Sequence, residues 1–185
     1  MPVSNILIKT SLPGVIILEP KVHSDDRGFF FESFNLRDFN HTLGTNVTFV
    51  QDNHSCSFKG VLRGLHYQIK YPQGKLVRVI KGAVFDVAVD IRRSSKNFGK
   101  WVGVELSSEN KRQLWIPEGF AHGFIVTSDS AEFLYKTTDY RYQEYERSLL
   151  WSDPELNIRW PLNTPPIIND KDLSGKKLME SECLD

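Results

Sequence analysis

Hydrophobic and polar residues alternate over short runs along most of this chain, and such alternation is typical of β-strands with one buried face. Gly and Pro separate the runs, as at Pro13-Gly14, Pro72-Gln73-Gly74 and Lys81-Gly82, where they favour tight turns. The strands predicted in this way are residues 6–10, 15–19, 29–34, 47–53, 60–68, 75–80, 83–91, 99–106, 112–116, 122–126 and 132–138.

A single helix is well marked in the sequence. Asn35 can cap its start and Gly44 can end it, so we predict a helix over residues 36–43. Residues 24–28 are expected to form a loop, and weaker helical patterns are confined to the C-terminal tail. Many short strands with few helices predict one mainly β domain over residues 1–185, a sandwich or barrel of the jelly-roll class.

The predicted strand at 60–68 departs from a simple alternating pattern. Strict alternation places Arg63 on one face and His66 on the other, so each face carries a polar group. One interpretation is a surface arginine whose alkyl part covers apolar residues, together with a hydrogen-bonded core histidine. The other is a functional site, because sites are where polar residues override the packing pattern.

Charge and cysteine content narrow the choice of partners and compartment. The 23 basic and 23 acidic residues balance, which argues against a nucleic acid or a membrane surface as the main partner. Cys56 and Cys183 lie far apart without metal-ligand spacing, which favours a reducing compartment and a cytoplasmic protein. No secretory signal or membrane span is expected, because residues 1–10 lack the signal pattern and the apolar runs are short.

Residues 117–123 form a second unusual segment, Pro-Glu-Gly-Phe-Ala-His-Gly. Its Pro-x-Gly turn leading to His122 resembles the second motif of the cupin barrels. The first cupin motif supplies two histidines and a later glutamate, but here only His66 stands in that region. Two histidines make a poor metal site, so we expect no metal, with a metal-dependent cupin as an alternative. A core histidine is the alternative for His122, but the same turn also presents Glu118, which favours a site.

Eight segments stand in the order and near the spacing of one enzyme family. They are DRGFFFE at 26–32, QDNHS at 51–55, LRGLHYQ at 62–68, PQGKLVRV at 72–79, GAVFDVAVD at 82–90, IPEGFAHGF at 116–124, YKTT at 135–138 and NDKD at 169–172. Each segment alone is weak, but together they extend from about residue 8 to 175 and are specific. The chain resembles the dTDP-4-dehydrorhamnose 3,5-epimerase family of nucleotide-sugar epimerases.

This resemblance implies a cofactor-free isomerase that inverts C3 and C5 of dTDP-4-dehydro-6-deoxy-D-glucose and gives dTDP-4-dehydro-L-rhamnose. Inverting a carbon beside a ketone needs a base, an acid on the opposite face and a positive charge for the enolate. The resemblance assigns His66 as the base with Asp172 behind it, Tyr135 as the acid and Lys75 as the charge. The substrate contacts that it implies are Arg27, Glu32, Gln51, Asp52, Asn53, Arg63, His122, Arg141, Glu146 and Lys171.

One departure concerns recognition of the nucleotide base. The family usually places an aromatic residue six positions after Tyr135, where this chain has Arg141 between Tyr140 and Tyr142. Arg141 can stack on thymine through its guanidinium plane or reach a phosphate, and a one-residue shift can instead bring in either tyrosine.

The resemblance also implies a homodimer, and the apolar residues 29–31 are suited to its interface. Two alternatives to the double epimerase remain at this point besides the metal-dependent cupin. One is an epimerase of the same fold that acts at C3 or C5 alone, because base and acid would be the same. The other is a nucleotide-sugar-binding module without catalysis, against which the complete set of His66, Tyr135 and Asp172 argues.

Overall fold

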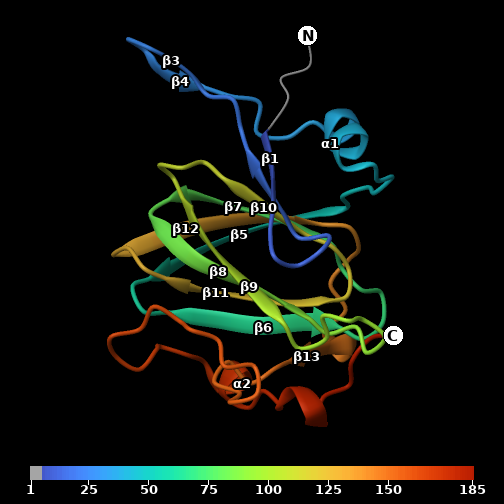
Figure 1. The fold of residues 1–185 in the computed structure, drawn as a ribbon. Coiled ribbons are helices and arrows are strands. Elements are labelled where there is room, and N and C mark those ends of the chain that lie inside the picture. The colour runs from blue at the N-terminus through green and yellow to red at the C-terminus, as the bar shows by residue number, and fades with distance from the viewer. Residues whose placement is uncertain (1–5) are drawn as a thin grey trace.

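Two antiparallel β-sheets lie face to face in this computed structural model, which describes residues 6–185 (Figure 1). In spatial order the larger sheet contains β1 (Ile6–Lys9), β2 (Ile16–Glu19), β10 (Gln113–Ile116), β7 (Lys75–Lys81), β12 (Ser130–Thr137) and β5 (Gln51–Phe58). The smaller sheet contains β13 (Glu146–Ser148), β6 (Leu62–Gln68), β11 (Phe120–Val126), β8 (Ala83–Asp90) and β9 (Trp101–Ser107). This arrangement confirms the predicted mainly β class.

The space between the sheets is filled by apolar side chains. The larger sheet contributes Val77 and Phe133, and the smaller sheet contributes Val84 and Phe124. The rings of Phe124 and Phe133 stack with their centroids 4.2 Å apart. Because successive strand residues point to opposite faces, His122 shares the inner face with Phe124 and meets Phe133 there. A polar side chain is thus built into the interior layer.

The C-terminal tail covers the outer face of the smaller sheet (Figure 1, orange to red). Leu149, Leu156 and Leu178 from the tail are buried in one cluster with Leu65 and Val87 from the sheet. The tail carries the short helix α2 (Asp170–Leu173) and the 3-10 helix η2 (Leu178–Glu180), and η1 (Gln143–Tyr145) precedes β13. Packing of the tail therefore brings α2 beside β6, so that Asp172 meets His66, 106 residues away in the sequence.

The predicted helix α1 (Leu36–Leu43) has the predicted bounds and covers the larger sheet. The Asn35 side chain accepts a hydrogen bond from the Asp38 amide, and Gly44 ends the helix in the left-handed conformation at φ 64°. Phe39 is the buried residue of α1, and its ring meets the Trp115 ring edge-on, with the ring centroids 5.2 Å apart.

No helix within residues 6–185 is long and apolar enough to cross a membrane.

Two predicted strands were misplaced. The strand predicted at 29–34 ends at Phe30, because β4 (Gly28–Phe30) pairs only with β3 (His23–Asp25) in a hairpin that projects from the barrel (Figure 1). The loop predicted at 24–28 is part of that hairpin. The strand predicted at 47–53 instead runs over β5, whose residues are mostly polar and show no apolar alternation. The short strand β13 was not predicted.

The pairing of β6 with β11 contains an irregularity that decides which way its polar residues point. His66 lies opposite His122, but Arg63 lies opposite Phe124, so the register shifts by one residue between them. Arg63 and His66 therefore face the same side, contrary to the strict alternation expected from the sequence. Gly64 makes the shift possible at φ 119°, since a Cβ there would lie 2.5 Å from the Gly123 Cα.

Replacing Gly64 is expected to damage the fold more than replacing a glycine in open space. Gly64→Ala should lower the free energy of unfolding by about 2–4 kcal/mol, because backbone strain and a close contact combine. Gly60→Ala is the matched control: Gly60 also has a positive φ, 78°, but no atom lies within 4 Å of an added Cβ. It should cost about 1–2 kcal/mol. Urea unfolding measures both, and equal losses would contradict the role of Gly64.

Candidate active site

A cavity lies between the two sheets, beside β6 and the loop that follows β12. Its lining combines residues of both sheets with the loop: Gln51, Asn53, His66, Tyr67, Gln68, Gln73, Lys75, Tyr135, Thr137, Arg141 and Glu146. The structure thus gathers three of the four predicted catalytic residues, His66, Lys75 and Tyr135, around one space.

The fourth predicted catalytic residue, Asp172, lies behind His66. His66 Nε2 is 2.6 Å from Asp172 Oδ1, and the Gly64 amide donates to Asp172 Oδ2 at 3.0 Å. Although burial would raise the pKa of Asp172, the hydrogen bond and charge of His66 and the Gly64 amide hold it below its usual value. An ionised Asp172 keeps the proton of neutral His66 on Nε2, so that Nδ1 is the nitrogen free to accept a proton.

Tyr135 approaches the same cavity from the larger sheet. It lies on β12 opposite Asn53 of β5, and its ring packs against the interior cluster near Phe133. Burial raises the pKa of Tyr135, and the charge of Arg141 opposes that shift. A neutral phenol is therefore held at neutral pH on the wall opposite His66, where it can donate a proton.

Lys75 supplies a buried positive charge at the bottom of the cavity. Its side chain is buried, and Nζ donates to the carbonyl oxygen of His66 at 3.3 Å. Burial lowers the pKa of Lys75 from its ordinary value of 10.5 to about 8, with Asp86 and Glu146 acting in the opposite direction. A protonated amine at this place is suited to stabilising an enolate oxygen.

His122 lies deeper than the predicted substrate contact implies. Its Nε2 is 2.9 Å from Asp86 Oδ2, and both side chains are buried. Burial lowers the pKa of His122 and raises that of Asp86, while their mutual attraction opposes both shifts. The sequence analysis did not select Asp86, although a carboxylate within the apolar run of 83–91 was a usable signal.

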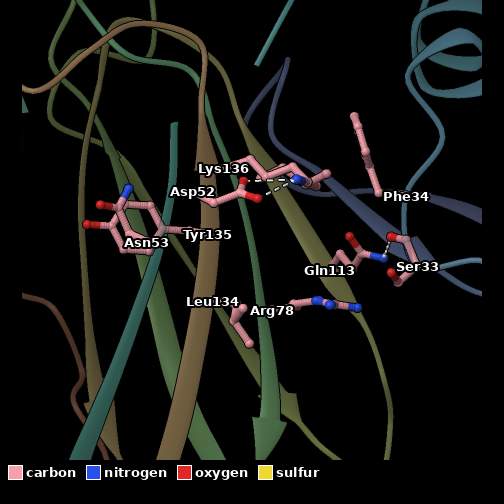
Figure 2. Close-up of a pocket in the computed structure, with 10 residues that line it drawn as sticks. Ser33, Phe34, Asp52, Asn53, Arg78, Gln113, Leu134, Tyr135 and Lys136 are labelled. Carbon is pink, nitrogen blue, oxygen red and sulfur yellow. Dashed lines mark hydrogen bonds and ion pairs between the residues drawn. The ribbon is translucent and has the colours of Figure 1, made fainter. Parts of the chain in front are cut away.

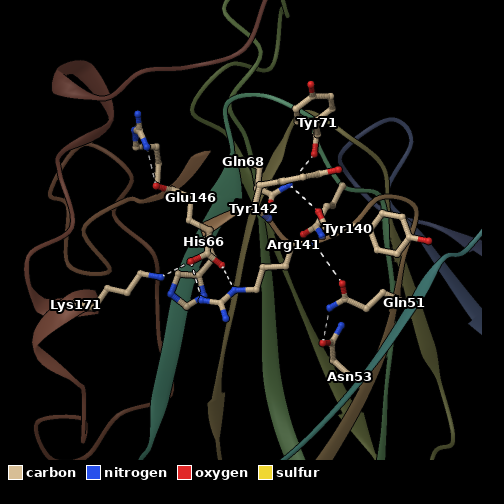
Figure 3. Close-up of polar contacts among 12 residues, drawn as sticks. Gln51, Asn53, His66, Gln68, Tyr71, Tyr140, Arg141, Tyr142, Glu146 and Lys171 are labelled. Atoms are coloured by element: carbon tan, nitrogen blue, oxygen red, sulfur yellow. Dashed lines mark hydrogen bonds and ion pairs between the residues drawn. The ribbon is translucent and has the colours of Figure 1, made fainter. Parts of the chain in front are cut away.

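Arg141 and Lys171 converge on Glu146 at the mouth of the cavity (Figure 3). Arg141 Nε lies 2.6 Å and Nη2 3.0 Å from the Glu146 carboxylate, and Lys171 Nζ lies 2.6 Å from it. Nearby, Gln51 donates to Asn53 at 2.8 Å and accepts the Arg141 amide at 3.2 Å. Five predicted substrate contacts are thereby brought together.

The other predicted contacts lie elsewhere in this chain. Arg63 is exposed and donates to the hydroxyl of Ser57 on β5 at 2.9 Å. Arg27 is exposed at the tip of the β3–β4 hairpin, where it pairs with Asp25, and Glu32 is exposed in the segment after β4. Neither of these two lines the cavity.

Asp52 lies on the outer face of the larger sheet, beside a second cavity. It pairs with Lys136 at 2.9 Å. Figure 2 shows this pair together with Arg78, across the strands from the side chains of Tyr135 and Asn53. This second cavity lacks an opposed base and acid, so the space around His66 is the better candidate for chemistry.

Gln68 is a structural residue of the site that sequence reasoning did not select. Its side chain is buried, and Nε2 donates to the carbonyl oxygens of Tyr71 and Tyr140 at 2.7 and 3.2 Å. Its Oε1 accepts the Tyr142 amide at 2.7 Å. Gln68 thus fixes the backbone of the loop that carries Arg141, and a polar residue at the end of a buried strand was the available signal.

The arrangement has the parts that proton transfer beside a carbonyl requires. His66 and Tyr135 come from opposite sheets, and Lys75 lies with them at one cavity. Among residues 6–185, no group of three or more His, Cys, Asp and Glu side chains is placed to hold a metal ion. The residues present support acid–base chemistry through an enolate.

Known proteins resemble the chain over nearly its whole length. The family model described as dTDP-4-dehydrorhamnose 3,5-epimerase matches residues 9–180. The chain belongs to the dTDP-4-dehydrorhamnose 3,5-epimerase family. A dTDP-4-dehydrorhamnose 3,5-epimerase from Shigella flexneri is 62% identical over 177 residues, which cover 95% of this chain and 97% of that protein. The family and the epimerase class of isomerase, both predicted from the sequence, are confirmed.

Solved structures confirm the cupin-type barrel of this epimerase. The crystal structure of dTDP-6-deoxy-D-glucose-3,5-epimerase from Legionella pneumophila in complex with dTDP-4-keto-L-rhamnose has a TM-score of 0.94 and 54% identity, covering 96% of this chain and 94% of that chain. A 3'-monoepimerase from Streptomyces bikiniensis in complex with dTDP-quinovose has a TM-score of 0.87 and 32% identity. The match covers 92% of this chain and 86% of that chain. The fold alone therefore does not distinguish double from single epimerisation.

The burial of Lys75 predicts a pH dependence of stability. Between pH 8 and 10.5 the unfolded epimerase keeps a lysine proton that the native protein has released, so stability rises with pH in this window. The free energy of unfolding of the wild type minus that of Lys75→Met should increase by about 3 kcal/mol across it. Urea unfolding of both proteins at several pH values measures this difference. The contributions of the other titrating groups cancel, because the two proteins share them. A constant difference would contradict the lowered pKa.

Proposed function

We propose that this epimerase inverts C3 and C5 of dTDP-4-dehydro-6-deoxy-D-glucose and forms dTDP-4-dehydro-L-rhamnose, acting as a single catalytic domain. The observation that carries the proposal is the cavity in which the His66–Asp172 pair and Tyr135 approach from opposite sheets. Membership of the epimerase family supplies the substrate class.

The proposed steps follow from these positions. His66 Nδ1 takes the proton from the carbon beside the ketone, and the electron pair moves to the carbonyl oxygen. Lys75 stabilises the enolate oxygen, and Asp172 stabilises the imidazolium. Tyr135 then gives its proton to the opposite face of the carbon. His66 releases its proton to solvent and Tyr135 regains one, which restores the starting state for the second carbon.

Action at both carbons is favoured over action at one. The Shigella and Legionella relatives are named as 3,5-epimerases and are far more similar to this chain than the monoepimerase is. A single-site epimerase of a related dTDP-4-keto-deoxysugar is the second candidate, because it needs the same base and acid.

Incubation with dTDP-4-dehydro-6-deoxy-D-glucose in D2O tests the function by NMR. The wild type should place deuterium at both C3 and C5, because each inversion exchanges a carbon-bound proton with solvent. His66→Asn should reduce exchange at both carbons by several orders of magnitude, since the proposed base is removed. Tyr135→Phe should retain exchange while epimer formation drops.

The labelling pattern separates the candidates. Deuterium at a single carbon would favour the single-site epimerase, and no deuterium with folded wild type would refute the proposed function. Near-normal exchange by His66→Asn would remove His66 as the base. A parallel fall of exchange and epimerisation in Tyr135→Phe would show that the phenol does more than donate the second proton.

We further propose that the epimerase is a cytoplasmic homodimer whose β3–β4 hairpin completes the site of the second copy. Phe29 and Phe30 are 61% and 73% exposed on this hairpin, more than expected for aromatic residues in a monomer. Arg27 and Glu32, expected to bind substrate, lie outside the cavity of their own chain. A β3–β4 hairpin that extends into the site of a second copy accounts for both observations. The free Cys56 and Cys183 support a reducing compartment.

Mixing two defective variants tests the shared site. Light scattering should give twice the 21.3 kDa chain mass. Arg27→Ala and His66→Asn should each lose most turnover, and co-refolding them should restore roughly a quarter of the sites, since half of the dimers are mixed and hold one intact site. No recovery in a mixture that forms dimers would refute the contribution of Arg27 to the second copy.

A further inference from the structure

The Glu146 carboxylate holds two cations from different parts of the chain. Arg141 comes from the loop after β12 and binds it through two nitrogens, and Lys171 comes from α2 and binds it through one. Hydrogen bonds from both partners, against the effect of burial, lower the pKa of Glu146 to about 2. The carboxylate is therefore ionised at all ordinary pH values, and the three-residue cluster has a net charge of +1.

Arg141 belongs to the same cavity as the proposed base and acid. Arg141 lines the cavity together with His66 and Tyr135. Figure 3 shows its guanidinium at the Glu146 carboxylate, and its charge acts on the phenol of Tyr135. A sugar ring that is to lie between base and acid has to share this space with the guanidinium.

The side chain of Arg141 can move while its backbone stays in place. Its amide is held by the Gln51 side chain, and the neighbouring Tyr142 amide is held by Gln68. The hydrogen bonds of its guanidinium, within the described residues, all go to Glu146. The Arg141 side chain is 56% exposed, whereas that of Glu146 is 16% exposed, so an incoming anion can reach the cation more easily than the carboxylate.

We propose that Glu146 is a resting counter-ion and that Arg141 exchanges it for the diphosphate of the nucleotide sugar. In the free enzyme Glu146 holds Arg141 across the cavity. On binding, the guanidinium moves to the diphosphate, which accepts the same two-nitrogen contact and carries more negative charge. Lys171 remains on Glu146 and keeps α2, with Asp172, in place. This inference rests on the proposed function, because it takes dTDP-linked sugars as the ligand.

Binding of dTDP and thymidine, measured by calorimetry, tests the exchange. Arg141→Ala should weaken dTDP binding by about 10-fold to 100-fold, because a charge-assisted contact to the diphosphate is lost. Thymidine, which has no phosphate, should bind unchanged or more tightly. Arg141→Lys should fall between wild type and Arg141→Ala for dTDP. Arg37→Ala is the matched control, since Arg37 is 86% exposed on α1, and it should leave both affinities unchanged.

Glu146→Gln separates exchange from a merely structural role. If Glu146 competes with the diphosphate, this variant should bind dTDP severalfold more tightly, because the resting state is no longer favoured. The gain in dTDP affinity should be largely absent when Glu146→Gln is made in the Arg141→Ala background. A double-mutant cycle of the four proteins measures this coupling. A structural Glu146 would give weaker binding in both backgrounds.

The outcomes distinguish this inference from the function on which it rests. Failure of the folded wild type to bind dTDP would refute the proposed substrate class. Binding of dTDP by the wild type, with Arg141→Ala within twofold of it, would refute the exchange alone. Equal losses of dTDP and thymidine binding in Arg141→Ala would also refute it, since Arg141 would then act on the nucleoside or on the fold.

Discussion

The one-residue shift between β6 and β11 is the constraint on which the site depends. It turns Arg63 and His66 to the same side, where a regular ladder would separate them. The close approach of Gly64 and Gly123 allows the shift. One oxygen of the Asp172 carboxylate accepts a hydrogen bond from the Gly64 amide, and the other lies within hydrogen-bond distance of His66 Nε2. The same carboxylate therefore binds the backbone of the irregular segment and orients His66, the proposed base, so the fold and the proposed chemistry are linked at one residue.

This linkage makes the His66–Asp172 pair depend on packing far from the cavity. Asp172 comes from α2, a helix of four residues that cannot be stable alone. Burial of Leu149, Leu156 and Leu178 against the smaller sheet holds the tail that carries α2. Each such side chain contributes about 1.5–3 kcal/mol when fully buried. The apolar outer layer thus provides the energy that places one carboxylate 2.6 Å from His66.

The sequence predicted those elements of the structure that residues close in the sequence determine, and it missed those that tertiary packing determines. Helix α1 was predicted because Asn35 and Gly44 mark its ends, and β7 and β8 because apolar alternation and Lys81-Gly82 mark theirs. The bounds of β5 were missed because most of its residues are polar, so no apolar alternation marks them. Asp172 was found only through family resemblance, since its partner His66 is 106 residues away and tertiary packing joins them. The direction of Arg63 was missed because a register shift leaves no periodic signal.

Two histidines of the smaller sheet each pair with an aspartate, and the surroundings of the two pairs favour His66 as the proposed base. His66 and His122 are opposite each other in the ladder, and each has a carboxylate partner. At the inner pair, burial raises the pKa of Asp86 and lowers that of His122, so charge is disfavoured there. At the outer pair, the pKa of Asp172 is lowered, so its charge persists. A general base must become positive during the reaction, and only the outer histidine has both an ionised partner and an open face toward the cavity.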